Sequence, residues 1–138
     1  MRLETLVRLA GLGQLGLAAA STAIPSVLRW REGMAGLRPL LRQVFWVYAA
    51  YILGFHLAFG ALSALAPGWL LDGSGLATAL TGFIAAYWGV RLALQFLYLD
   101  RSDVPRGALF RVAEAVLVAL FVFLTAVYGA ALAANLRR

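Results

Sequence analysis

The chain has 138 residues, of which 63% are hydrophobic and 13% are charged, against about 45–50% and about 25% in ordinary soluble domains. This composition excludes an ordinary soluble domain and is typical of a membrane protein. The net charge is +6 and the 12 basic residues are all Arg. Because most of them lie at the edges of apolar stretches, we expect membrane lipids as partners and no nucleic acid.

The absence of Cys excludes thiol-disulfide exchange and thiolate metal ligation. A haem held between two His ligands within one bundle needs a second His, and this chain has only His56. Motifs for phosphate binding, for a serine nucleophile elbow and for a Ser–Lys pair are also missing. We therefore expect no enzyme activity, no cofactor and no metal.

Four long apolar stretches fill most of the chain, at roughly residues 5–24, 43–66, 75–99 and 110–134. About 20 apolar residues are needed for a helix to cross a hydrocarbon core of ~30 Å, and a helix satisfies its own backbone hydrogen bonds where water is absent. The sequence therefore predicts an all-α protein, a single domain over residues 1–138 that forms an integral membrane bundle of four transmembrane helices with short loops.

The first stretch has a second interpretation. Arg2 and Arg8 precede an apolar run that ends in a tract of small residues at 18–23, and this order also occurs in cleavable signal peptides. We favour a membrane helix because the apolar run continues through Ile24 to Leu28. Cleavage would leave three spans.

Turn and cap residues predict where the helices begin and end. Pro25 should end or bend the first helix, and Pro67 should end the second, because proline lacks the N–H that continues the helix. Ser74 is a candidate N-cap for the third span. Asp103 followed by Pro105 predicts the start of the fourth.

Small residues predict where helices pack closely, since helices in lipid associate through van der Waals contact at Gly and Ala. The expected contact faces contain Gly13, Gly16 and Ala20 in the first span and Ala126, Ala130 and Ala134 in the fourth. Spacing alone leaves open whether these faces meet within one chain or between two copies.

The Arg residues are divided unequally between the two sides of the predicted bundle. The first and third loops carry seven of them, Arg29, Arg31, Arg38, Arg42, Arg101, Arg106 and Arg111, and the other side carries Arg2, Arg137 and Arg138. By the positive-inside bias, we expect a multi-pass protein of a bacterial inner membrane with loops 1 and 3 in the cytoplasm.

Each predicted span has a polar edge, which must face protein or water rather than lipid. The simplest bundle turns all four edges inward. These edges contain Gln14 and Ser21; Tyr48, His56 and Ser63; Thr81, Trp88, Arg91, Gln95 and Tyr98; and Glu114, Thr125 and Tyr128.

Arg91 is the most costly of these residues in lipid, at about 2.5–3.5 kcal/mol on insertion scales. It could extend toward the interface or form an ion pair with Glu114. Alternatively, Arg91, Gln95 and Tyr98 could form a binding site for an anion or a lipid headgroup. These residues, with Glu114 and His56, are the candidate ligand-binding residues.

His56 lies near the middle of the second span. We expect a neutral imidazole that is hydrogen-bonded to Tyr, Ser or a backbone carbonyl. A proton relay is the alternative, because the charge of His changes near physiological pH. A membrane enzyme that uses His56 and Glu114 as acid and base has less support.

Two functions remain after these exclusions. The first is an accessory or scaffold subunit of a membrane complex, or a homo-oligomer, without catalytic motifs. The alternative is a small membrane carrier or binding protein with an intramembrane polar site around Arg91 for an anionic or quinone-like head group. A filled interior would favour the first, and a pocket that reaches Arg91 would favour the second.

Overall fold

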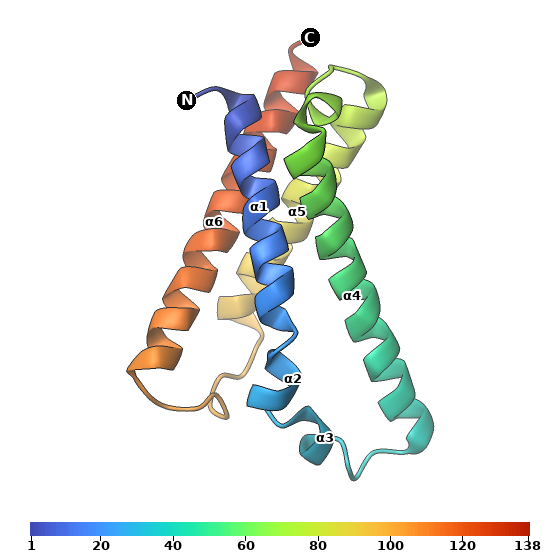
Figure 1. Cartoon of the computed structure of the whole chain (residues 1–138), viewed down its shortest axis with the longest axis vertical. Coiled ribbons are helices and arrows are strands. Elements are labelled where there is room, and N and C mark those ends of the chain that lie inside the picture. Colours follow the sequence, from blue (N-terminus) through green and yellow to red (C-terminus); the bar gives the residue numbers. More distant parts are fainter.

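The computed structural model describes residues 1–138 and is all-α. Four long helices run alternately up and down, with three short helical turns in the connections (Figure 1). The long helices are α1 (Leu3–Ser21), α4 (Pro39–Leu65), α5 (Gly75–Leu97) and α6 (Ala108–Leu136). The turns are α2 (Ile24–Val27), α3 (Trp30–Gly33) and the 3-10 helix η1 (Pro67–Leu70).

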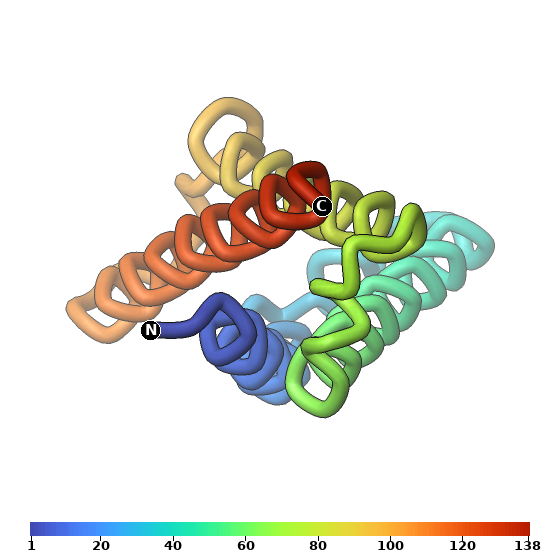
Figure 2. The backbone as a smooth tube through the Cα atoms, turned by 90° about the horizontal axis from the view of Figure 1, so that it is seen from above, coloured from blue at the N-terminus to red at the C-terminus, as the bar shows by residue number.

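The two ends of the molecule differ. Both termini and the α4–α5 connection lie together at one end, which we call the terminal end (Figure 1). The connections 22–38 and 98–107 lie at the other, which we call the arginine-rich end. Helix α1 packs along α4, α5 packs along α6, and α1 also contacts α6. Toward the arginine-rich end the helices spread apart, and α4 and α5 leave in different directions (Figures 1 and 2).

Helices α4, α5 and α6 are each long and apolar enough to cross a membrane. Helix α1 is shorter, with 19 residues, and does not meet the same hydropathy criterion. Glu4 and Arg8 lower its hydropathy in the first two turns, and their side chains lie 3.5 Å apart in an i, i+4 ion pair. The structure thus shows three candidate spans packed with an N-terminal helix, where the sequence predicts four spans.

Two predicted helix boundaries are confirmed. The Ser74 hydroxyl accepts a hydrogen bond of 3.1 Å from the Ala77 N–H and caps α5. Helix α4 ends at Leu65, and Pro67 begins the 3-10 turn that follows. An N-cap side chain accepts from the free N–H of the second or third residue of a helix, which is why Ser74 could be recognised in advance.

Helix α1 ends at Ser21, four residues before Pro25, and Pro25 lies at the start of the separate turn α2, so the first helix ends next to this proline as expected. The hydroxyls of Ser21 and Thr22 donate to carbonyls of the preceding turn. The predicted start of the fourth helix is wrong. Helix α6 begins at Ala108 and not at Asp103, and no side chain caps it. Gly107 precedes it with φ +149°, a conformation that residues with a Cβ rarely adopt, so this glycine sets the start of the helix.

Helices α1 and α4 approach each other closely at Gly11. A Cβ on Gly11 would lie 2.5 Å from the backbone nitrogen of Ala64 and 2.7 Å from the carbonyl oxygen of Gly60. By contrast, Gly16 has nothing within 4 Å and Gly13 meets only Leu120 of α6, at 3.0 Å. Gly16 therefore makes no close contact within the chain, where Gly11 and Gly60 form the close approach instead. A contact of Gly16 with another copy stays a prediction.

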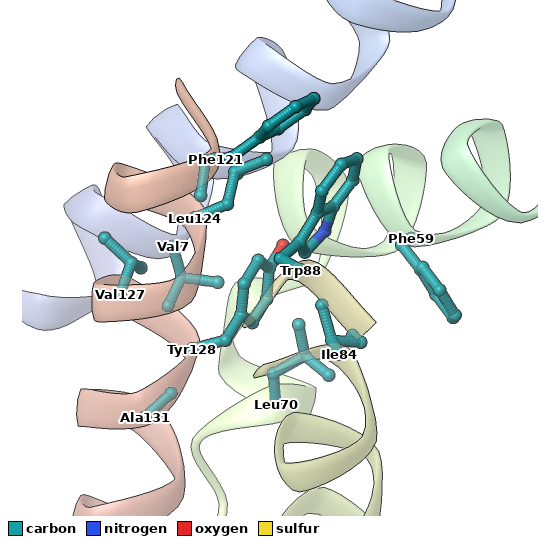
Figure 3. Packing of buried hydrophobic residues seen from close by; sticks show 11 residues of the cluster. Val7, Phe59, Leu70, Ile84, Trp88, Phe121, Leu124, Val127, Tyr128 and Ala131 are labelled. Carbon is teal, nitrogen blue, oxygen red and sulfur yellow. The ribbon is translucent and has the colours of Figure 1, made fainter. Parts of the chain in front are cut away.

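The core lies where the four long helices meet (Figure 3). Trp88 and Tyr128, both with no exposed surface, are its largest side chains. Trp88 stacks on Phe121, with ring centroids 5.5 Å apart. Buried aromatic rings at this spacing add about 0.5–1.5 kcal/mol beyond their area.

Hydrogen bonds of one buried amide fix the terminal end. The Asn135 amide near the end of α6 donates to the Leu70 carbonyl at 2.9 Å and to the Thr81 hydroxyl at 3.3 Å, and it accepts from the Gly73 N–H at 3.1 Å. Because Asn135 is 4% exposed, these bonds replace water around its amide. They attach the α4–α5 connection to the end of α6.

Candidate functional site

Apart from the Asn135 contacts at the terminal end, two groups of polar side chains lie inside the bundle, one buried and one half-buried. The buried group joins all four long helices. Gln14 of α1 donates to the Tyr128 hydroxyl of α6 at 2.5 Å and accepts from the Trp88 indole of α5 at 3.2 Å. The Ser63 hydroxyl of α4 lies 2.5 Å from the same Tyr128 oxygen. We call these four residues the central network.

The central network is complete as it stands. Gln14, Ser63, Trp88 and Tyr128 have no exposed surface, and no buried side-chain nitrogen or oxygen in the protein lacks a hydrogen-bond partner. An unpaired buried donor or acceptor costs about 1–3 kcal/mol, so each member holds the other three in place. This group therefore orients the four helices and has no free polar atom directed at a ligand.

The second group begins at His56. Its Nε2 lies 2.8 Å from the Tyr87 hydroxyl of α5, and its ring lies 5.0 Å from that of Trp88. The expected hydrogen bond between His56 and a tyrosine is thus present. Tyr87 was not among the predicted site residues, although its position four residues before Arg91 places both on one face of α5.

The second group continues along α5 toward the arginine-rich end. Arg91 Nη1 donates to Gln95 Oε1 at 3.1 Å, and Gln95 Nε2 donates to Glu114 of α6 at 3.4 Å. The guanidinium of Arg91 also lies over the ring of Phe121, 5.0 Å from its centroid, a cation–π contact. We call Arg91, Gln95 and Glu114 the polar chain.

The predicted ion pair between Arg91 and Glu114 is not formed directly. Glu114 pairs with Arg101 of the α5–α6 connection, and Gln95 stands between Glu114 and Arg91. Helical spacing cannot identify Arg101 as the partner of Glu114, because Arg101 lies in the α5–α6 connection. The connection folds back over the start of α6, and this brings a loop arginine to the carboxylate.

The structure joins three of the five candidate site residues, Arg91, Gln95 and Glu114, by hydrogen bonds. His56 bonds instead to Tyr87, one turn before Arg91. Tyr98 is 80% exposed and lies apart from the polar chain, beyond the last residue of α5. Tyr48 is likewise 64% exposed, so the second span turns only part of its predicted polar edge inward. Both tyrosines lie toward the arginine-rich end, where amphipathic rings favour a membrane interface.

Two open cavities flank the connection 98–107 at this end. The larger, about 590 Å³, lies between the two arginine-rich connections and is lined by Val27, Leu28, Arg29, Trp30, Asp100, Asp103, Val104 and Pro105. The smaller, about 410 Å³, is lined by Arg101, Val104, Pro105, Arg106, Gly107, Phe110, Arg111 and Glu114.

The hydrogen bond from the Ser102 N–H holds the pKa of the Asp100 carboxyl below its ordinary value.

These features restrict the chemistry of the protein. No three His, Asp or Glu side chains gather closely enough to hold a metal ion. His56 and Glu114 make their hydrogen bonds to different partners, Tyr87 and Arg101. What the polar chain does offer is a half-buried guanidinium with a neutral amide beside it, which can bind an anion.

The fold and hydropathy indicate a small polytopic helical membrane protein. Comparisons with protein-family models, with curated proteins and with solved structures find no match to this chain.

Proposed function

We propose that this protein is a non-catalytic structural subunit of the membrane, an accessory or scaffold component that associates with a second copy or with other membrane subunits. The central network carries this proposal. It draws one side chain from each long helix and leaves no buried polar atom unpaired. An interior of this kind stabilises one arrangement of helices and offers nothing for acid-base or nucleophilic chemistry.

We further propose that α1 crosses the bilayer with α4, α5 and α6. A helix of 19 residues is about 28 Å long at 1.5 Å per residue, which is close to the ~30 Å hydrocarbon core. Its charges, Glu4 and Arg8, lie in the first two turns, while Gln14 near its middle is buried against α5 and α6. The arginine asymmetry then orients both connections at the arginine-rich end toward the cytoplasm.

Association is supported by small residues that face outward. Gly16 has open space around it, and Ala20, Ala126 and Ala130 are exposed. None of them serves a close contact within the chain, so these faces are available to another helix, which in lipid approaches most closely at small residues.

The test is the oligomeric state of the full chain in lipid nanodiscs. Wild-type protein should form a complex of defined stoichiometry, and Gly16→Leu should shift it toward monomer without lowering its melting temperature. Gly54→Leu is the matched control, because Gly54 is exposed on α4 and also has nothing within 4 Å. A wild-type monomer that also cross-links to no other membrane protein in cells would contradict the proposal.

A further inference from the structure

Arg91 is a cation without a carboxylate partner inside a membrane-spanning helix. It lies six residues before the end of α5 at Leu97, about 9 Å along the helix axis at 1.5 Å per residue. Its hydrogen bond within the protein goes to the neutral amide of Gln95. Glu114 is the one acidic residue in α4, α5 and α6, and Arg101 already occupies it.

An uncompensated guanidinium at this depth is expensive unless an anion reaches it. Phe121 covers one face of the guanidinium, while the side chain as a whole remains only partly buried. A guanidinium presents its N–H groups in the plane of the fork, which matches two oxygens of a phosphate. The cation–π contact covers only the face and Gln95 takes one Nη1 donor, so the remaining N–H groups at the edge of the fork can reach such an anion.

The surroundings of Arg91 are apolar on both sides. Helices α4 and α5 spread apart toward the arginine-rich end (Figures 1 and 2), and both expose large side chains there. On α4 these are Tyr48, Tyr51, Ile52 and Phe55, between 48% and 66% exposed, and on α5 they are Val90, Leu94 and Leu97, between 39% and 85% exposed. Such surfaces suit acyl chains rather than a soluble anion.

Charge complementarity selects the kind of lipid. The connections 22–38 and 98–107 contain five Arg, and Arg42 and Arg111 near the starts of α4 and α6 raise the number at this end to seven. The two connections carry only three carboxylates, Glu32, Asp100 and Asp103. Basic segments next to a membrane attract anionic lipids. The leaflet at this end should therefore be enriched in anionic phospholipid around the protein.

We propose that Arg91, with Gln95 beside it, binds the phosphate of an anionic phospholipid from the leaflet at the arginine-rich end. The lipid's acyl chains lie along the exposed faces of α4 and α5. Arg91 extends toward Gln95, one turn nearer that end, which is the direction in which a long basic side chain reaches for the interface. The inference rests on the proposed crossing of α5 and is independent of the subunit role.

The first experiment measures lipid that stays with the full chain. Wild-type protein is reconstituted in equal amounts of phosphatidylglycerol and phosphatidylcholine, extracted in detergent and examined by native mass spectrometry. Phosphatidylglycerol should be retained preferentially, and Arg91→Gln should lower that retention about tenfold, as expected for loss of a hydrogen bond to a charged group. Arg106→Gln removes an exposed loop arginine of equal charge and should change retention less than twofold.

An equal loss of phosphatidylglycerol retention in both variants would indicate general attraction to a basic surface and would overturn the proposed site. Full retention of phosphatidylglycerol in Arg91→Gln would overturn it as well. Since Arg91→Gln could disturb folding, a second measurement uses wild-type protein alone. A phosphatidylglycerol with a photoreactive headgroup should label peptides from residues 87–97 and 110–121, and excess inorganic phosphate should not compete. Labelling confined to 98–107, or competition by inorganic phosphate, would contradict lipid binding at Arg91. Oligomeric state measured in the same samples separates this result from the subunit proposal.

Discussion

Gln14 and Tyr128, 114 positions apart in the sequence, meet at 2.5 Å in the centre of the bundle. Tyr128 also pairs with Ser63, so its single hydroxyl links α1, α4 and α6. Tyr128→Phe removes only the hydroxyl oxygen, and with it the hydrogen bonds to both Gln14 and Ser63. Hydrogen bonds within membrane proteins contribute on average about 0.6 and at most about 1.7 kcal/mol each, so we expect a loss of about 1–2 kcal/mol in unfolding free energy.

The measurement is denaturant unfolding of the purified protein in detergent micelles. Tyr98→Phe is the matched control, since this tyrosine is 80% exposed and outside the central network. Equal stability of Tyr128→Phe and wild type would show that the network does not hold the helices together.

Gly11 should tolerate no side chain. Its substitution by Ala places a methyl group 2.5 Å from the Ala64 nitrogen, which forces α1 away from α4, and such overpacking costs about 1–3 kcal/mol. Gly16→Ala meets nothing within 4 Å and should be neutral, or stabilising by up to about 1 kcal/mol through helix propensity. Thermal melting of both variants tests the prediction, and a larger loss for Gly16→Ala would refute it.

Glu114 should couple more strongly to Arg101 than to Arg91. The side chains of Arg101 and Glu114 are 45% and 34% exposed, so water screens the pair, and we expect a coupling of about 0.2–1 kcal/mol. Arg91 reaches Glu114 only through Gln95, so its coupling should be smaller. Two double-mutant cycles with Gln substitutions measure both terms. A stronger coupling of Glu114 to Arg91 than to Arg101 would contradict this prediction and would indicate a direct Arg91–Glu114 pair.

Asn135→Ala should loosen the terminal end without opening the arginine-rich end. It removes the bonds to Leu70, Thr81 and Gly73, so amide hydrogen exchange should accelerate in residues 67–74. Arg138→Ala is a useful comparison, because Arg138 is exposed and donates to the Leu71 carbonyl of the same connection. We expect a smaller change for it, and uniform acceleration throughout the chain would instead indicate global destabilisation.

The membrane topology can be read from single cysteines, since the chain contains none. In intact cells a membrane-impermeant thiol reagent should label Ser74→Cys and Arg2→Cys and should spare Gly33→Cys. Positions 2 and 33 are on opposite sides only if α1 crosses the bilayer. Labelling of positions 2 and 33 in the same assay would exclude that crossing. Labelling of position 33 alone would indicate the opposite orientation.

The sequence by itself determined the helical class, the three most apolar spans and the grouping of seven Arg at one end, because each depends on local composition and length. It also indicated which face of a span is polar, since a period of 3.6 residues places Trp88, Arg91 and Gln95 on one side of a helix. Ser74 could be assigned as a cap for the same reason: its partner, the Ala77 N–H, lies three residues away.

Only the tertiary structure decided which partner each polar side chain finds. A hydrogen bond requires its atoms to approach within about 3.5 Å, and this depends on the rotation, tilt and height of two helices together. Periodicity therefore could not distinguish Gly11 from Gly16 as the close contact, because both are glycines on one apolar helix. It could not assign Arg101 to Glu114 either, since that pair exists only because the connection 98–107 folds back over α6.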